Sequence, residues 1–262
     1  MVRIVGNNNM FLRIFKPLQV MYSEGKFKFS KSGITCTSVN PEHTAMLSIS
    51  INKNFFKQYK INKYEEFGID IEKIIKLLEK KTFKRMEHET TIVFDSKLDY
   101  GIIETIGKRT SHSGKFNLFP KEGISEPKVP NLELKWEYNI SDLELLKNIC
   151  EDIKSESNHI FFVGAKDNIT LKADLRSYMK GDELSSYKLK TPEMECIRSD
   201  DKEAIGLYEV LDFWYFIWGV RQLFGKNARV TIEFDTDYPI RLTAKDKNIE
   251  ILYLLAPRIE SY

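Results

Sequence analysis

Apolar and polar residues alternate with two different periods along the chain, and each change of period marks an expected element. Residues 25–51 alternate as β-strands do, whereas residues 70–86 repeat apolar positions every three to four residues, as an amphipathic helix does. The same order returns later, with helices predicted at 141–154 and 203–224 and strands at 160–189 between them. This mixture predicts a strand-rich α+β fold with two long helices in each half.

One helix start carries a capping signal. Ser141 has the side chain of a good N-cap, and Glu144 stands three residues later, where a capping box places its acidic residue. We therefore expect the third helix to begin at Ser141.

Two short segments recur in the same order, which indicates an internal repeat. The sequence KSGITC at residues 31–36 resembles KDNITL at 166–171, an offset of 135 positions. The sequence TIVFD at 91–95 resembles TIEFD at 231–235, an offset of 140 positions. Because both pairs keep their order, the chain reads as a duplicated domain.

A proline-rich segment separates the two copies. Residues 119–131, FPKEGISEPKVPN, contain three of the eight prolines of the chain. Proline lacks a backbone donor and fixes φ, so this segment is expected to be an extended connection and not a strand of a sheet. We predict two domains, residues 1–118 and 132–262, joined by a connecting loop at 119–131.

The helix predicted at 70–86 has one apolar and one cationic side. At 100° per residue its lysines gather on one side and its apolar residues on the other. Such a face is either a solvated surface or an electrostatic binding face, and a membrane-surface helix is disfavoured because no bulky aromatic residue joins the apolar side. The lysines are Lys73, Lys76, Lys80 and Lys84, and the apolar residues are Ile71, Ile74, Ile75 and Leu78.

Composition adds bounds on the function. The 262 residues are 42% hydrophobic and include 32 aromatic side chains, too many for a disordered chain. The 40 Lys and Arg against 38 Asp and Glu give a formal net charge of +2, which excludes a strongly basic nucleic-acid-binding domain. The three cysteines are far apart, and no stretch is long and apolar enough for a membrane span or signal, so we expect a reducing, intracellular location without membrane association.

The sequence offers no constellation of catalytic or metal-binding residues. Four scattered histidines have no metal-ligand spacing, so no metal and no cofactor is predicted. Carboxylate pairs such as Asp200 with Asp201 and Asp235 with Asp237 fall in predicted turns, where such residues are common. We therefore predict no catalytic residue and no enzyme activity, and an enzyme with an unrecognised carboxylate site remains a remote alternative.

Several segments together resemble one known family. Four segments are similar to signatures of PCNA-type DNA sliding clamps, the archaeal and eukaryotic-like DNA polymerase processivity factors. They are GITCTSVNPEHTAML at residues 33–47, VTIEF at 230–234, DYPIR at 237–241 and YLLAPRIE at 253–260. The resemblance covers nearly the whole chain and agrees with the repeat. It implies the DNA-clamp fold, with two tandem repeated domains per chain, sheets outside and helices lining a ring.

The resemblance also implies a function and partners. Clamps of this family perform no chemistry; a trimeric ring encircles double-stranded DNA without sequence specificity, is placed there by a clamp loader, and tethers DNA polymerase, flap nuclease and DNA ligase through short aromatic motifs. Subunits would join through edge strands near residues 108–116 and 178–189. A homotrimer is expected, and a heterotrimer stays open.

The resemblance assigns two sets of site residues. Basic residues on the ring-lining helices would face DNA phosphates, and an apolar pocket near the connecting loop and the C-terminal end would hold partner motifs. The expected DNA-facing residues are Arg13, Lys16, Lys73, Lys76, Lys80, Lys84, Lys147, Lys154 and Arg221. The expected pocket residues are Val39, His43, Thr44, Ile124, Val129, Pro239, Leu254, Leu255, Ala256 and Pro257.

The chain departs from the family pattern at several positions. Pro17 is expected to kink or end the first lining helix. The run FWYFIW at residues 213–218 is too aromatic to be buried on one side of a helix, and Glu79 and Glu151 stand where basic residues are usual. These departures keep open a specialised subunit of a heterotrimeric clamp, or a plasmid- or virus-encoded variant. The location would be the cytoplasm or nucleoid of an archaeal cell, or a nuclear or viral replication site otherwise.

Overall fold

The structure, a computed structural model, describes residues 1–21, 23–80, 88–120, 127–173 and 185–258 of the chain. The chain divides into two compact units. Unit 1 comprises Met1–His43, Leu47–Val129 and Asp246–Ile251, and unit 2 comprises Thr44–Met46, Pro130–Lys245 and Leu252–Tyr262.

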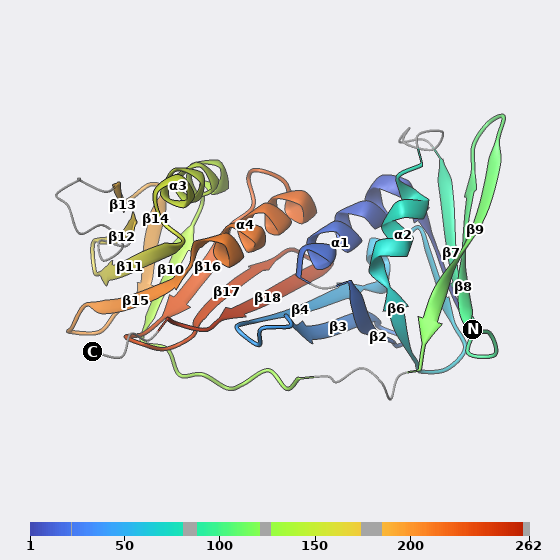
Figure 1. Cartoon of the computed structure of the whole chain (residues 1–262), viewed down its shortest axis with the longest axis horizontal. Helices are drawn as coiled ribbons and strands as arrows, with labels where there is room; N and C mark the ends of the chain where they lie inside the picture. The colour runs from blue at the N-terminus through green and yellow to red at the C-terminus, as the bar shows by residue number, and fades with distance from the viewer. Residues whose placement is uncertain (22, 81–87, 121–126, 174–184, 259–262) are drawn as a thin grey trace. The chain divides into compact units, whose positions relative to one another are not determined.

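Unit 1 has two helices that lie side by side over one face of its strands (Figure 1). Its strands follow one hydrogen-bonded order, β4-β3-β2-β6-β9-β8-β7-β1-β5, in which β6 and β9 pair only at Gly68 with Phe119 and Ile69 with Leu118. The elements are β1 (Val2–Asn7), α1 (Asn8–Met21), β2 (Glu24–Phe29), β3 (Gly33–Val39), β4 (Ala45–Asn52), β5 (Gln58–Ile61), β6 (Glu65–Asp70), α2 (Ile71–Leu78), β7 (Glu89–Phe94), β8 (Tyr100–Ile106) and β9 (Ser111–Phe119), with a short 3-10 turn at Lys53–Phe55.

Unit 2 repeats this plan, again with two adjacent helices on one face of the strands (Figure 1). Its strands follow the orders β13-β12-β11-β15 and β14-β10-β16-β17-β18. The elements are β10 (Trp136–Ile140), α3 (Leu143–Glu156), β11 (His159–Ala165), β12 (Asn168–Ala173), β13 (Ser186–Leu189), β14 (Met194–Arg198), β15 (Ala204–Glu209), α4 (Val210–Phe224), β16 (Val230–Phe234), β17 (Ile240–Lys245) and β18 (Ile249–Leu255).

The sequence repeat has a structural counterpart. The matching segments 31–36 and 166–171 lead into β3 and β12, each the second strand of the hairpin that follows the first helix of its unit. The matching segments 91–95 and 231–235 lie in and just after β7 and β16, each the strand that follows the second helix. The α+β class and the duplication are therefore confirmed, while the boundaries 1–118, 119–131 and 132–262 stay a prediction.

Aromatic side chains fill the core of each unit. In unit 2 the ring of Phe162 lies 5.1 Å from that of Phe213 and 5.6 Å from that of Tyr208, which joins β11 to α4 and β15. In unit 1 the ring of Phe94 lies 4.7 Å from that of Phe29 and 5.5 Å from that of Phe116. Each such buried side chain contributes roughly 1.5–3 kcal/mol by leaving water.

Three expected helix limits differ from the structure. The helix predicted at 70–86 ends at Leu78, because the apolar positions that dock it end there; residues 79 and 80 are not helical and 81–87 lie outside the described residues. The helix predicted at 203–224 begins at Val210, because Ala204–Glu209 pair with β11 as strand β15. The first helix does not end at Pro17 but continues to Met21.

The expected cap of α3 was also wrong by one residue. Asp142, not Ser141, accepts a hydrogen bond from the backbone N–H of Leu145 at 2.8 Å. The Ser141 hydroxyl instead donates to the backbone carbonyls of Pro192 and Glu193, at 3.1 and 3.2 Å. The Ser141 hydroxyl therefore stabilises the turn before β14 and does not cap the helix.

Replacing the cap should weaken unit 2. The substitution Asp142→Ala leaves the Leu145 N–H without its acceptor, and we expect the free energy of unfolding to fall by about 1 kcal/mol in denaturant titrations. Asp142→Asn is the matched control, since an amide oxygen caps nearly as well. Equal stability of the Ala variant and the native chain would contradict the assignment.

Candidate nucleic-acid interface and partner segment

The helices of unit 1 display positive charge on their outward side. Arg13 on α1 and Lys73 and Lys76 on α2 are exposed, and Lys80 is exposed just beyond the end of α2. The docked side of α2 is apolar, since Ile71, Ile74, Ile75, Leu77 and Leu78 are buried. The predicted sidedness is therefore correct for Lys73 and Lys76, whereas Lys80 follows the end of the helix and Lys84 lies outside the described residues.

Some of these cations have carboxylate partners. The Lys16 ammonium lies 2.6 Å from a carboxylate oxygen of Glu79, and Lys76 pairs with Glu72 one helical turn earlier. The hydrogen bond that Lys76 donates to Glu72, followed by the negative charge of Glu72, raises the pKa of Lys76. Within the described residues Lys73 has no such partner, so its charge faces solvent directly.

Lys80 makes a different contact. Its Nζ lies 2.6 Å from Nε2 of His112 on β9. Partial burial and then the Lys80 charge lower the pKa of His112, so the imidazole stays neutral at pH 7 and can accept a hydrogen bond from the ammonium. The positive charge of this contact therefore rests on Lys80.

The helices of unit 2 carry cations that are mostly paired. Lys147 pairs with Glu151 at 2.8 Å, and Arg221 pairs with Glu144 at 2.6 Å. The hydrogen bond from Lys147 lowers the pKa of Glu151, which therefore remains a carboxylate. The exposed Lys154 lies over an aromatic ring, with its ammonium 4.4 Å from the centroid of the Trp214 indole.

Carboxylates offset part of the positive charge on both helical faces. Two of the five described cations predicted for unit 1 pair with the carboxylates of Glu72 and Glu79, whereas two of the three predicted for unit 2 pair with those of Glu144 and Glu151. The sequence showed Glu79 and Glu151 as departures but did not pair them. The spacing of four residues between Glu72 and Lys76, and between Lys147 and Glu151, is the signal that predicts two of these pairs.

The C-terminal part of the predicted pocket lies in unit 2 and is tied down by backbone bonds. The N–H of Ala256 donates to the carbonyl of Thr44 at 2.8 Å, and the N–H of Arg258 donates to the carbonyl of Leu207 at 2.7 Å. Ala256 and Pro257 are partly exposed, whereas Leu254 and Leu255 are 5% and 0% exposed and belong to the core.

The remaining pocket residues lie on loops and strand ends. Val39 is partly exposed at the end of β3, His43 is exposed in the following turn with a φ of 56°, and Val129 is 42% exposed. Pro239 is partly exposed in the turn between β16 and β17. Ile124 lies outside the described residues.

Sequence reasoning missed two apolar side chains beside Pro239. Tyr238 and Ile205 are 53% and 39% exposed, and the carbonyl of Ile205 accepts from the N–H of Asp237 at 3.2 Å. The carbonyl of Tyr238 accepts a hydrogen bond from the buried Tyr208 at 2.8 Å, which fixes this turn. No alternation in the sequence of β15 signals the exposure of Ile205, because residues 206–208 of the same strand are all buried.

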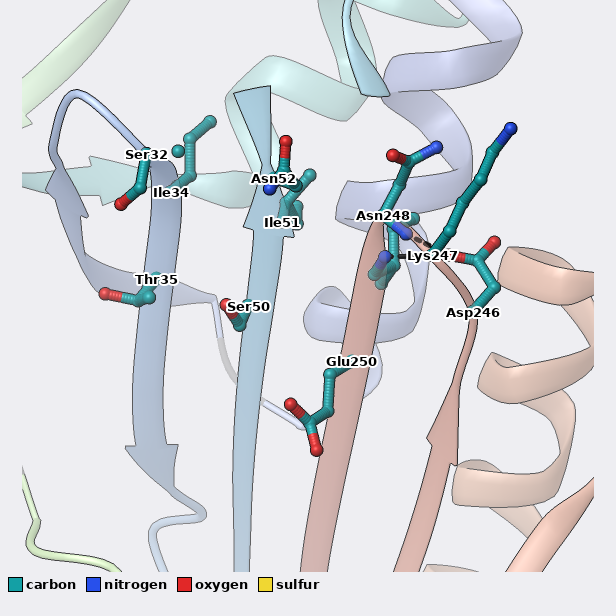
Figure 2. Close-up of a pocket in the computed structure, with 12 residues that line it drawn as sticks. Ser32, Ile34, Thr35, Ser50, Ile51, Asn52, Asp246, Lys247, Asn248 and Glu250 are labelled. Atoms are coloured by element: carbon teal, nitrogen blue, oxygen red, sulfur yellow. Dashed lines mark hydrogen bonds between the residues drawn. The ribbon is translucent and has the colours of Figure 1, made fainter. Parts of the chain in front are cut away.

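Unit 1 also has a polar depression of about 220 Å³, but its side chains do not converge as those of a binding site do. Figure 2 shows its side chains, such as Ser50 and Glu250, spread along the strands instead of converging on one point. Its Asp246 carboxylate accepts from the backbone N–H groups of Asn248 and Ile249, a local turn that occupies the group.

Two further findings concern chemistry and membranes. Among the residues that the structure describes, no group of three or more His, Cys, Asp or Glu side chains is placed to hold a metal ion. In that same part of the chain, no helix combines the length and the apolar character that a membrane crossing requires.

Comparison with known proteins identifies the family. The sequence model described as "Proliferating cell nuclear antigen, N-terminal domain" matches residues 3–104. The chain is 30% identical over 251 residues to the DNA polymerase sliding clamp of Methanosarcina barkeri, covering 93% of each chain, and 25% identical over 269 residues to that of Archaeoglobus fulgidus, covering both chains fully. The fold matches the structure "C-terminal region of FEN-1 bound to A. fulgidus PCNA" with a TM-score of 0.81 and 21% identity, again over the whole of both chains.

The structural match shows that the chain has the α+β DNA-clamp fold of PCNA. The chain belongs to the family of DNA polymerase sliding clamps. Its function is that of a sliding clamp, a processivity factor of DNA replication, and nothing in the comparisons favours the specialised, plasmid, viral or enzyme alternatives.

Proposed function

We propose that three copies of this chain close into a ring around duplex DNA, with the helices of both units turned toward the DNA. The cations of α1 and α2 support this most strongly, because Lys73 adds to them an exposed charge that has no carboxylate partner within the described residues. Lysine and arginine contacts to phosphate fix the position of a protein on DNA without reading bases. Such contacts suit a clamp that slides along any sequence.

Removing the unpaired lysine should weaken the hold on DNA. In Lys73→Ala, we expect the clamp to leave nicked circular DNA faster than the native chain does. The salt dependence of binding should also be shallower, by about one unit of slope for each phosphate that the variant no longer neutralises. Retention after loading, measured by gel filtration over a range of salt concentrations, checks both expectations.

The matched control removes the same charge elsewhere. Lys60 is exposed on β5, away from both helices of unit 1, and Lys60→Ala should retain DNA as the native chain does. An equal reduction of retention in both variants, or full retention by Lys73→Ala, would refute the proposed DNA-facing role of α2.

Two open sheet edges support ring closure. In the described residues, β9 pairs with β8 along Ser111–Asn117 but with β6 only at Leu118 and Phe119, and β13 is the last strand of its group. Strand β9 overlaps the predicted contact segment 108–116 and continues to Phe119, and β13 lies within the predicted segment 178–189, of which residues 178–184 are outside the described part. We propose that β9 of one copy pairs with β13 of the next, since head-to-tail contacts that close form rings.

The internal repeat gives this pairing a precedent. By their order in the two units, β18 corresponds to β9 and β4 corresponds to β13. Within unit 1 the segment leading into β18 already meets the end of β4, where the N–H of Asn52 donates to the carbonyl of Asn248 at 2.7 Å. The same kind of strand junction between copies would close the ring.

A mass measurement tests the assembly. Light scattering during gel filtration should give about three times the chain mass of 30.7 kDa at micromolar concentrations. A mass of one chain that persists at much higher concentrations would contradict a self-sufficient homotrimer and favour a heterotrimer.

We propose that the segment Ala256 to Arg258, together with Pro239, binds the short aromatic motifs of partner enzymes. The support is the partial exposure of Ala256 and Pro257 on a backbone that is fixed on both sides by hydrogen bonds. A. fulgidus PCNA binds the C-terminal region of FEN-1, so a flap nuclease is the first expected partner. Clamp loader, DNA polymerase and DNA ligase would use the same segment, and the chain itself would perform no chemistry.

A charge placed in this segment should block the partner. We expect Ala256→Glu to weaken binding of a labelled peptide from a flap nuclease C-terminus at least tenfold, because a carboxylate would be desolvated against an aromatic anchor. Fluorescence anisotropy titration measures the affinity. Asn227→Glu, in the exposed turn after α4, adds the same charge elsewhere and should bind normally; equal affinities of both variants would reject the segment.

A further inference from the structure

The outer face of α4 is aromatic where a DNA-facing helix of a clamp is expected to be basic. Phe213 and Phe216 of the run at 213–218 are buried, with 0% and 2% exposure, and belong to the core of unit 2. Trp214, Tyr215 and Trp218 are partly exposed and lie within about 100° of one another around the helix. These three residues are called the aromatic face below.

Contacts with α3 hold the first ring of the aromatic face in place. The indole N–H of Trp214 donates to a carboxylate oxygen of Glu151 at 3.3 Å, and the ammonium of Lys154 lies 4.4 Å from the ring centroid. The ring of Tyr215 meets that of Trp214 edge to face, at 5.4 Å and 61°. Trp214 is therefore fixed in one orientation before any ligand arrives, which lowers the entropy cost of binding.

The charges around the aromatic face are mostly neutralised. Glu151 is bound by Lys147 and Trp214, and Glu144 is bound by Arg221. The other two acidic residues of α3 accept hydrogen bonds from β13 and the residue before it: Asp152 accepts from Tyr187, and Glu156 accepts from Ser185. Lys154 is the exposed cation next to the rings. Such a surface binds phosphates weakly, but it exposes flat aromatic rings with one cation, Lys154, beside them.

We propose that the aromatic face binds the unpaired bases of single-stranded DNA by stacking, with Lys154 contacting a phosphate. In duplex DNA the base faces are already stacked on one another, so these rings would find π-faces only where bases are unpaired. Aromatic side chains combined with neighbouring cations are the general means of binding single strands without sequence preference. The inference rests on the proposed function, which turns this helical face toward DNA.

The spacing of the rings suits more than one base. Trp214 and Trp218 are four residues apart, which places them about 6 Å apart along the helix axis on nearly the same side. Each ring can therefore take a separate base, as in proteins that bind successive nucleotides on a series of aromatic side chains.

Tryptophan fluorescence tests the proposal directly. The third tryptophan, Trp136, is only 2% exposed, so quenching on titration reports on Trp214 and Trp218. We expect an oligothymidine to quench the signal with a shallow salt dependence. An abasic oligonucleotide of equal length carries the same phosphates, and equal quenching by that strand would overturn the proposal, because the bases would then contribute nothing.

A variant pair gives a second readout. Trp214→Leu with Trp218→Leu should weaken binding of a labelled oligothymidine at least tenfold in anisotropy titrations, with circular dichroism to establish that the variant is folded. Leu211→Ala is the matched control, since Leu211 is 38% exposed on the same side of α4 but has no ring. Unchanged affinity in the double variant would overturn the proposal and would favour a protein segment as the ligand of this face.

The same variants separate this inference from the proposed function. Retention on nicked circular DNA is assigned to ring closure and to the cations of the helices, all of which the double variant keeps, so this variant should be retained as the native chain is. Failure of retention in the native chain, with normal quenching by oligothymidine, would reject the ring proposal alone. Normal retention without any quenching would reject the aromatic face alone.

Discussion

A helix that docks on a sheet through one apolar face has to present its opposite face to the outside, and both units are organised around this constraint. In α2 the docked side consists of isoleucine and leucine, and the opposite side presents Lys73 and Lys76. In α4 the docked side contains Phe213 and Phe216, and the opposite side presents Trp214. The same frame therefore displays a cationic surface in one unit and an aromatic surface in the other.

The duplication explains how one frame supports different surfaces. Core positions are constrained in both units by the same strand orders, so residues such as Phe94 and Phe234 occupy corresponding strands after the second helix. Outward positions of the helices carry no such constraint, because solvent accepts almost any side chain there. Divergence after duplication would thus collect on the helical faces and leave the sheets alike.

Much of the fold can be predicted from the local sequence pattern. The predictions that were wrong concern residues whose structure depends on partners far away in the sequence. The strands of residues 25–51 and the two sides of α2 were predictable because each position there has a single consistent environment. Residues 204–209 were predicted as helix, but they form strand β15, which is fixed by pairing with β11; the paired residues lie between 40 positions apart, for Gly164 and Ala204, and 50 apart, for His159 and Glu209. Ser141 and Asp142 are equally good caps by residue type, but the Ser141 hydroxyl bonds to Pro192 and Glu193, which no local pattern reveals. The sequence shows the cations of the candidate site but not their partners on or next to other helices, such as Glu79 for Lys16 and Glu144 for Arg221.

The paired charges reconcile a net charge of only +2 with a function on DNA. The salt dependence and strength of phosphate binding follow the number of phosphates that a protein neutralises. A cation already held by a carboxylate, such as Lys147 by Glu151, neutralises a phosphate only by giving up that partner, so it adds little to this number. In the proposed ring, a few unpaired cations such as Lys73 would attract the nearest DNA phosphates weakly, and would attract each successive phosphate as the ring moves. Weak contacts of this kind exchange between neighbouring phosphates at little cost, which is the physical requirement for a protein that must stay on DNA and still move along it.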